Sequence, residues 1–185
     1  MVCPGSIREE AKYPDNSGAA ADDGTHTHTV LEHCVKAQLA DPTAMVGIKM
    51  KDHVGEFVVD ADRAARVKTA VEYLKSRVEE IIKSGHFFPE VIAEKRVDPA
   101  YLIGRSDLSG TVDVQIHGGD VLEIIDYKDG MGVVSAKDNK QLEQYAMGVL
   151  ASLKLPINVQ YPFSKVRMTI IQPKLALKGM PPITS

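Results

Sequence analysis

The sequence predicts one α/β domain, in which a central mixed β-sheet is flanked by α-helices. Residues 60–84 carry apolar side chains at helical spacing, and two alternating stretches, 108–117 and 121–128, meet at the hairpin turn Gly118-Gly119-Asp120. The elements follow one another as helix, helix, three strands, helix and strand, an order typical of α/β proteins. A chain of 185 residues is long enough for one such domain, 1–185, with its own core.

The N-terminal part is predicted to be irregular and then helical. Residues 1–24 are polar and interrupted by proline and glycine, so we expect them to be largely irregular. The helical part, 25–85, begins with apolar residues at helical spacing, and Asp41-Pro42 ends this first helix. Residues 43–59 fit neither period. The charged face of the helix over 60–84 is expected to be a solvated surface.

The remaining residues, 86–175, are expected to form the αβ core. A first strand over 90–97 precedes the hairpin, and a last strand spans 165–172. Between them, residues 136–153 place Leu142, Tyr145, Ala146, Val149 and Leu150 on one helical face.

Composition limits the classes of function. The net charge of −3 and the pI of about 6.1 argue against a protein held on nucleic acid by bulk positive charge, but leave room for a local basic groove. The two cysteines, Cys3 and Cys34, cannot hold an iron–sulfur cluster and favour a reducing cytoplasmic compartment. No apolar run reaches the length of a membrane span, and no signal peptide is visible, so no membrane partner is expected.

The stretch "VLEIIDYKDG" ends in an acid and a base on the same face of a predicted strand. Because side chains alternate, Asp126 and Lys128 point one way and Tyr127 the other. Pairing around the hairpin brings Asp113 roughly opposite the 124–126 region. Two adjacent carboxylates repel each other, and a divalent cation relieves this repulsion. Oxygen ligands favour Mg²⁺ or Mn²⁺, and the backbone carbonyl of Tyr127 offers a further oxygen.

A lysine beside such a metal can orient the attacking water or stabilise charge on a phosphate. Together these groups fit metal-assisted hydrolysis of a phosphodiester. The Asp-x-Lys pattern alone is most simply a surface ion pair, since about 0.6 occurrences are expected by chance in a chain of this length. Its position at the end of an apolar strand, after a strand that carries Asp113, favours the catalytic role.

The combination of "GTVDV", "EIIDYK" and "QLEQY" resembles the PD-(D/E)XK nuclease superfamily. It is similar to the branch of the RecB nuclease domain, lambda exonuclease and the CRISPR-adaptation nucleases, and within it to a phage and prophage nuclease family. The segments that carry the resemblance are Cys3–Ser6, Gly24–Glu32, Gly110–Val114, Asp126–Gly132, Asn139–Gly148 and Ile170–Leu175. The resemblance implies a restriction-endonuclease-like fold and a metal-dependent deoxyribonuclease.

Two departures from that family pattern stand out. The segment Asp129-Gly130-Met131-Gly132 replaces a Gly-Lys-Gly pattern and removes a basic residue near the expected site. Relatives usually continue beyond the "QPKL" segment, so the resemblance implies either a short member or part of a longer one.

The resemblance also implies roles for single residues. Asp113 and Asp126 would hold the metal together with His28, whose imidazole suits Mn²⁺ better than Mg²⁺. Glu32, one helical turn after His28, would have a structural role or support the ligands from behind. Simpler interpretations are a surface histidine and an unremarkable glutamate.

Gln141 and Tyr145 are also one helical turn apart, and the resemblance implies that they contact DNA phosphate or the active site. A solvated glutamine and a tyrosine packed in the core are the alternatives.

Other charged residues are assigned more simply. Glu94 is interpreted as a strand-edge carboxylate, with an extra catalytic acid as the alternative. The isolated basic residues Lys95, Arg105, Lys137 and Lys140 would form a modest rim for DNA, although such residues are usually only solvated surface.

Three functions stay open from the sequence. The intact set of Asp113, Asp126 and Lys128 favours a DNA nuclease, and the resemblance favours an exonuclease on DNA ends or single strands in phage replication or recombination. The alternatives are a catalytically weak DNA-end-binding or recombination protein and a hydrolase of nucleotides. The expected partner is DNA in the cytoplasm of a bacterial host, and a homo-oligomer or a phage recombination partner is compatible with the resemblance.

Overall fold

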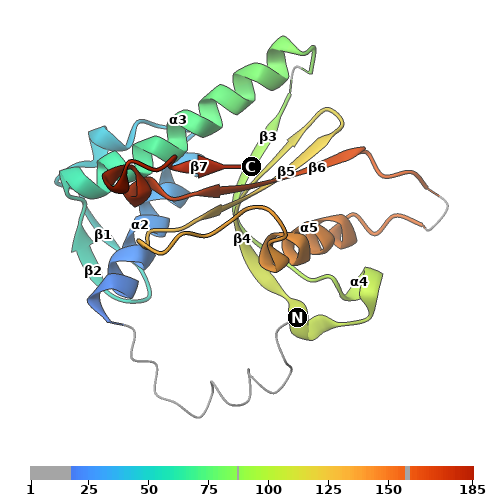
Figure 1. Cartoon of the computed structure of the whole chain (residues 1–185), viewed down its shortest axis with the longest axis horizontal. Helices are drawn as coiled ribbons and strands as arrows, with labels where there is room; N and C mark the ends of the chain where they lie inside the picture. Colours follow the sequence, from blue (N-terminus) through green and yellow to red (C-terminus); the bar gives the residue numbers. More distant parts are fainter. Residues whose placement is uncertain (1–17, 87, 157–158) are drawn as a thin grey trace.

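A five-stranded mixed β-sheet separates two groups of helices (Figure 1). A computed structural model describes residues 18–86, 88–156 and 159–185. In spatial order the strands are β3 (Glu90–Val97), β4 (Gly110–Gly118), β5 (Val121–Tyr127), β6 (Lys165–Ile171) and β7 (Ile183–Thr184). Only the β5–β6 pair is parallel, and the other neighbours are antiparallel. The predicted mixed sheet flanked by helices is confirmed.

The first group of helices consists of α2 (Ala19–Lys36) and α3 (Ala61–Lys83); in Figure 1, α2 lies on the left and α3 runs from the left up to the top of the view. The helix α3 begins where the Asp60 side chain accepts a hydrogen bond from the backbone N–H of Arg63, a typical N-cap. Apolar residues of both helices pack against β4, β5 and β6 in one core. The members of that core include Val30, Leu31, Cys34, Val67, Val71, Leu74, Val114, Ile116, Ile125, Tyr127 and Ile171.

The opposite face of the sheet is covered by α5 (Lys140–Ser152), at the lower right of Figure 1. The Asn139 side chain caps this helix by accepting hydrogen bonds from the backbone N–H groups of Gln141 and Leu142. The second core contains Val97, Val112, Leu122, Ile124, Ala136, Leu142, Ala146, Val149 and Ile170. The short elements α4 (Ala100–Ile103) and η2 (Ser106–Leu108) connect β3 to β4, and η3 (Pro173–Lys178) follows β6.

Because side chains alternate along β5, this strand contributes residues to both cores. Leu122 and Ile124 pack in the α5 core, while Ile125 and Tyr127 pack in the core of α2 and α3. The hairpin between β4 and β5 turns at Gly119, whose φ of 60° is a left-handed conformation that favours glycine. The motif strand therefore crosses the middle of the sheet, as the sequence predicts.

Several boundaries differ from the prediction. The helix α2 begins at Ala19, so the expectation that 1–24 is irregular is wrong for 19–24; residues 1–17, including the Cys3–Ser6 motif, lie outside the described residues. The ambiguous region contains η1 (Pro42–Met45) and a hairpin of β1 (Lys49–Lys51) and β2 (Glu56–Val58).

The charged face of α3 is not simply solvated, which corrects the sequence-based expectation. Arg63, Arg66 and Arg77 are buried, with exposed fractions of 6–9%. Each meets acidic partners from elsewhere in the chain, namely Asp23, Asp129 and Glu123. Periodicity could not reveal this, because the acids that neutralise the arginines are distant in sequence.

Across the described ranges, no helix combines the length and the apolar character needed to cross a membrane.

Candidate metal centre

The two motif aspartates lie where β5 leaves β4. The last pair of that ladder is Val114 with Ile125, so Asp113 and Asp126 come next along the two strands. In place of a further ladder pair, Oδ2 of Asp113 accepts a hydrogen bond from the backbone N–H of Tyr127 at 2.7 Å. The predicted approach of Asp113 to the end of the motif strand is confirmed.

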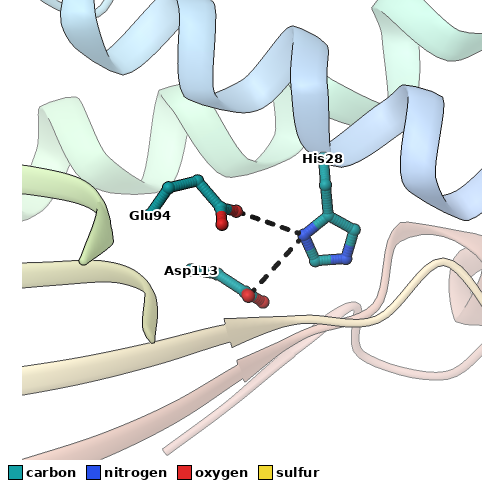
Figure 2. Close-up of side chains that lie close together, drawn as sticks. All are labelled: His28, Glu94 and Asp113. Atoms are coloured by element: carbon teal, nitrogen blue, oxygen red, sulfur yellow. Dashed lines mark ion pairs between the residues drawn. The ribbon is translucent and has the colours of Figure 1, made fainter. Parts of the chain in front are cut away.

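His28 and Glu94 lie against Asp113 (Figure 2). The Nδ1 atom of His28 is 3.7 Å from Oδ1 of Asp113 and 3.9 Å from Oε1 of Glu94. One nitrogen and two carboxylate oxygens lie within 4.8 Å of one another. Divalent cations hold such atoms at about 2.0–2.6 Å, so ligands this close can share one ion.

Each member of this cluster comes from a different element. His28 lies on α2, Glu94 on β3 and Asp113 on β4. The His28 ring meets the Tyr127 ring edge to face, with centroids 5.4 Å apart and an interplanar angle of 87°. Tyr127 is fully buried, so its ring is a rigid support that directs the imidazole toward the two carboxylates.

Glu94 has an unusual backbone conformation for the middle of a strand. Its φ is 49°, in the left-handed region that non-glycine residues avoid, while its neighbours Ala93 and Lys95 pair normally with Val114 and Val112. Such a conformation costs about 1–3 kcal/mol and is typical of functional sites. Glu94 lies on the edge strand β3, as the first interpretation has it, and its side chain also lies close to His28 and Asp113, as the alternative of an extra acid requires.

The electrostatics of the cluster disfavour its negative charges. Burial, followed by the charge of Asp126, raises the pKa of Asp113 to about 7. Burial and the charge of Asp113 raise the pKa of Glu94 to about 7. Burial also raises the pKa of Asp126, against the effect of Lys128. A bound cation would reverse all three effects.

His28, the histidine of the cluster, is held in its neutral form. Burial lowers the pKa of His28, although the charge of Glu94 opposes this effect. The imidazole is therefore neutral near physiological pH, and a neutral imidazole is the form that binds metals.

Asp126 is not part of the three-residue cluster but starts a chain of polar contacts. Its Oδ1 atom accepts a hydrogen bond from Lys128 Nζ at 3.0 Å, and the same ammonium donates to Oε1 of Gln141 at 3.2 Å. Nε2 of Gln141 then donates to the Tyr145 hydroxyl at 2.8 Å. Four residues predicted to act together are therefore connected side chain to side chain.

Asp126 does not behave as a surface residue, which argues against the simple ion-pair interpretation of Asp-x-Lys. Only 2% of Asp126 is exposed, while the Lys128 side chain is 31% exposed. Both oxygens of Asp126 lie against the same ammonium, with Oδ1 3.0 Å and Oδ2 2.9 Å from Lys128 Nζ. A carboxylate whose two oxygens share one ammonium retains lone pairs for a further ligand.

A glycine positions the end of this chain of contacts. A Cβ atom at Gly110 would lie 2.7 Å from Cε1 of Tyr145, so a larger residue would displace the tyrosine ring. The half-buried ring of Tyr145 packs against the α5 core, and its hydroxyl reaches Gln141. Both the packing interpretation and the polar contact of Tyr145 are therefore observed.

The four residues of the predicted basic rim do not all lie together. Lys140 pairs with Glu143 at 2.8 Å and lines a cavity together with Arg105, Gln141 and Tyr145. Lys137 instead lines a separate cavity next to Lys165 and Arg167, and Lys95 is exposed on β3. The structure thus groups only Lys140 and Arg105 beside the Gln141–Tyr145 pair. Glu32 pairs with Lys36, whose Nζ is 2.5 Å from its Oε1, and its charge is among those that raise the pKa of Glu94.

A second buried charge cluster supports the candidate site from behind. Asp129 follows Lys128 and lies 3.0 Å from both Arg66 Nε and Lys174 Nζ. Asp23 meets the same Arg66 and Lys174, and also Arg63. The Tyr127 hydroxyl donates to Asp129 at 3.3 Å. This cluster ties α2, α3 and η3 to the chain just after the motif strand, and it was not found by sequence reasoning.

The donor set fits a divalent cation. Two carboxylates and one neutral imidazole, with Asp126 nearby, match the ligands of Mn²⁺ and also accept Mg²⁺. The set contains no thiolate, and the described Cys34 is buried against Met45 with a 3.6 Å contact between their sulfur atoms. The predicted backbone ligand, the Tyr127 carbonyl, stays a prediction.

A family model described as a protein of unknown function (DUF2800) matches residues 1–179 of the chain. The chain therefore belongs to the DUF2800 family. No solved structure matches it.

Proposed function

We propose that the protein is a metal-dependent deoxyribonuclease with a PD-(D/E)XK-type active site. The observation that carries this proposal is the meeting of two groups of side chains at one end of the β4–β5 ladder. One group, His28, Glu94 and Asp113, can hold a divalent ion, and the other, Asp126 and Lys128, offers an acid and a cation beside it. A metal ion that activates water and a cation that stabilises charge on the phosphate both favour hydrolysis of a phosphodiester.

The residues of the metal group would bind the ion through one nitrogen and two oxygens. A divalent ion there would supply Lewis acidity to a phosphate oxygen and lower the pKa of a bound water molecule. Asp113 is fixed by its hydrogen bond from the Tyr127 backbone, and His28 by the Tyr127 ring, so the ligands are preorganised.

Lys128 would stabilise the negative charge that develops on the phosphate. Its ammonium is held by Asp126 on one side and Gln141 on the other, yet about a third of the side chain is exposed. Because Gln141 donates to the Tyr145 hydroxyl, that hydroxyl retains its own proton for donation to a phosphate oxygen. The chain of contacts thus presents two donors without a rearrangement of the buried acid.

The choice of DNA as substrate, and of an exonuclease over an endonuclease, rests on the resemblance of the motif segments to the RecB and lambda exonuclease branch. The positive charges of Lys140 and Arg105, which line one cavity with Gln141 and Tyr145, support a polyanion as the substrate.

A nuclease assay tests the proposal. The purified protein is incubated with Mn²⁺ or Mg²⁺ and with end-labelled linear DNA or closed circles, single- and double-stranded, in the presence or absence of EDTA. We expect degradation of linear DNA that EDTA abolishes and that Asp113→Ala and Asp126→Ala each lack. Degradation of circles would contradict the exonuclease choice, and binding of DNA ends without any cleavage would leave an end-binding protein instead.

A further inference from the structure

A cavity opens beside the Gln141–Tyr145 end of the candidate site. Its volume is about 720 Å³, and it lies between α5 and the segment that leads into β4. Gln141 and Tyr145 belong both to the chain of contacts from Lys128 and to the cavity wall. A group seated in this cavity is therefore adjacent to anything held by Lys128.

The walls of the cavity are suited to a flat aromatic group. Leu108, Met147 and the ring of Tyr145 provide apolar surface, and Ser109 and Gln144 add hydroxyl and amide groups. Thioether and aromatic side chains bind the faces of planar rings, while hydroxyl and amide groups satisfy their polar edges.

Positive charge lies only at exposed positions of the wall. The Arg105 and Lys140 side chains are 43% and 69% exposed, and each pairs with an acid on its own segment, Asp107 or Glu143. Exposed pairs of this kind are weak and yield to a competing anion. The cavity thus combines an apolar interior with exchangeable cations at its rim, which complements a base inside and phosphates outside.

We infer that this cavity receives one unpaired nucleobase of the DNA strand that is cut, next to the phosphate at Lys128. The inference rests on the proposed nuclease function for the identity of the substrate. A base within a duplex is stacked and paired and cannot enter without being extruded, which costs free energy. The cavity therefore makes the enzyme selective for single strands or frayed ends.

The first test compares two small substrates in Mn²⁺. Thymidine 5′-(p-nitrophenyl phosphate) carries a base, whereas methyl p-nitrophenyl phosphate carries only the diester. Met147→Trp fills the cavity, Ser109→Trp narrows it from the other wall, and Met180→Trp is the matched control outside the cavity wall. We expect both cavity variants to lower the ratio of the two kcat/KM values about tenfold, the order of losing one stacked base, and the control to keep it.

The second test measures binding alone, in EDTA, so that it does not depend on cleavage. The wild-type protein should bind an oligothymidine at least about tenfold more tightly than an abasic strand of equal length. The two cavity variants should lose this preference and Met180→Trp should retain it. Melting temperatures of all variants establish that they are folded.

The outcomes separate the two proposals. An unchanged base preference in both folded cavity variants, or no preference in the wild-type protein, overturns the base-binding cavity even if nuclease activity is present. A base preference that the cavity variants lose, in a protein that cleaves neither substrate, supports the cavity and overturns the nuclease.

Discussion

Two buried acids of β5, Glu123 and Asp126, differ in how many partners their carboxylates have. Glu123 is 1% exposed and receives hydrogen bonds from the Tyr73 hydroxyl at 2.5 Å, Arg77 Nε at 2.8 Å and Thr169 Oγ1 at 2.8 Å. Asp126 is 2% exposed, and its two oxygens lie 3.0 and 2.9 Å from one group, the Lys128 ammonium. Asp113, whose pKa the charge of Asp126 raises, accepts a hydrogen bond from the Tyr127 backbone and lies with Glu94 against His28.

The difference shows what each region is built for. A buried carboxylate with a full set of donors is complete and holds α3 to the sheet. A group of carboxylates with too few donors is unfavourable until a cation joins it. Burial of charge alone does not mark a functional site in this molecule; the imbalance between acids and their partners does.

The largest expected effect is the loss of stability when Glu123, the acid with a full set of donors, is replaced. Glu123→Gln leaves the buried Arg77 guanidinium without its buried charged partner, although the exposed Glu80 still pairs with it, and loss of one member of a buried pair costs about 3 kcal/mol or more. Denaturant unfolding measures this loss. A change below about 1 kcal/mol would mean that Glu123 does not stabilise the fold in the way described.

Lys128→Met should remove activity rather than stability. Loss of one preplaced charge at a transition state lowers turnover about 100-fold, while DNA and metal are still bound. Single-turnover cleavage, calorimetric metal affinity and the melting temperature are measured on the same variant. Unchanged cleavage would refute the catalytic role, and a loss confined to stability would make Lys128 a structural partner of Asp126.

Asp113→Asn should stabilise the metal-free protein, the opposite sign to Glu123→Gln. Burial raises the pKa of Asp113 to about 7 in the folded state, above its unfolded value of about 3.9. The folded state therefore loses stability between about pH 4, where Asp113 ionises in the unfolded chain, and about pH 7, where it ionises in the folded protein.

The asparagine variant avoids this loss, so its advantage should be roughly 1–2 kcal/mol at about pH 8 and disappear toward about pH 4. Denaturant unfolding in EDTA across this range provides the measurement. A variant less stable than wild type at high pH would show that the acid cluster is not unfavourable without metal.

The smallest effect concerns the choice of metal. The imidazole of His28 should make cleavage faster with Mn²⁺ than with Mg²⁺, and His28→Ala should narrow the difference. Initial rates with each metal at saturating concentration are compared. Equal wild-type rates in both metals would remove the reason to place His28 among the ligands.

The helix and the hairpin around Glu123, and part of the candidate site, could be predicted from the sequence. The helix expected over 60–84 is observed as Ala61–Lys83, and the predicted hairpin fixes the approach of Asp113 to Asp126. These features depend on local periodicity and on a tight turn, which short stretches of sequence encode.

Glu94 could not be predicted in the same way. Its left-handed backbone has no signature in "EVIAEKRV", and the partners of its side chain, His28 and Asp113, come from other elements. The burial of Arg66 and Arg77 was missed for a similar reason, because Asp129 and Glu123 meet them only in the folded chain. The two-residue strand β7 is too short for any alternation to appear.

Calorimetric titration of Mn²⁺ into the metal-free protein tests most directly whether the incomplete acid cluster is a metal site. We expect one ion per chain, affinity reduced at least about tenfold in Glu94→Gln, and binding lost in Asp113→Asn. The exposed acid Asp107, changed to Asn, serves as the control and should bind like wild type. Absence of binding to the wild-type protein, or equal affinity in all three variants, would contradict the assignment of His28, Glu94 and Asp113 as metal ligands.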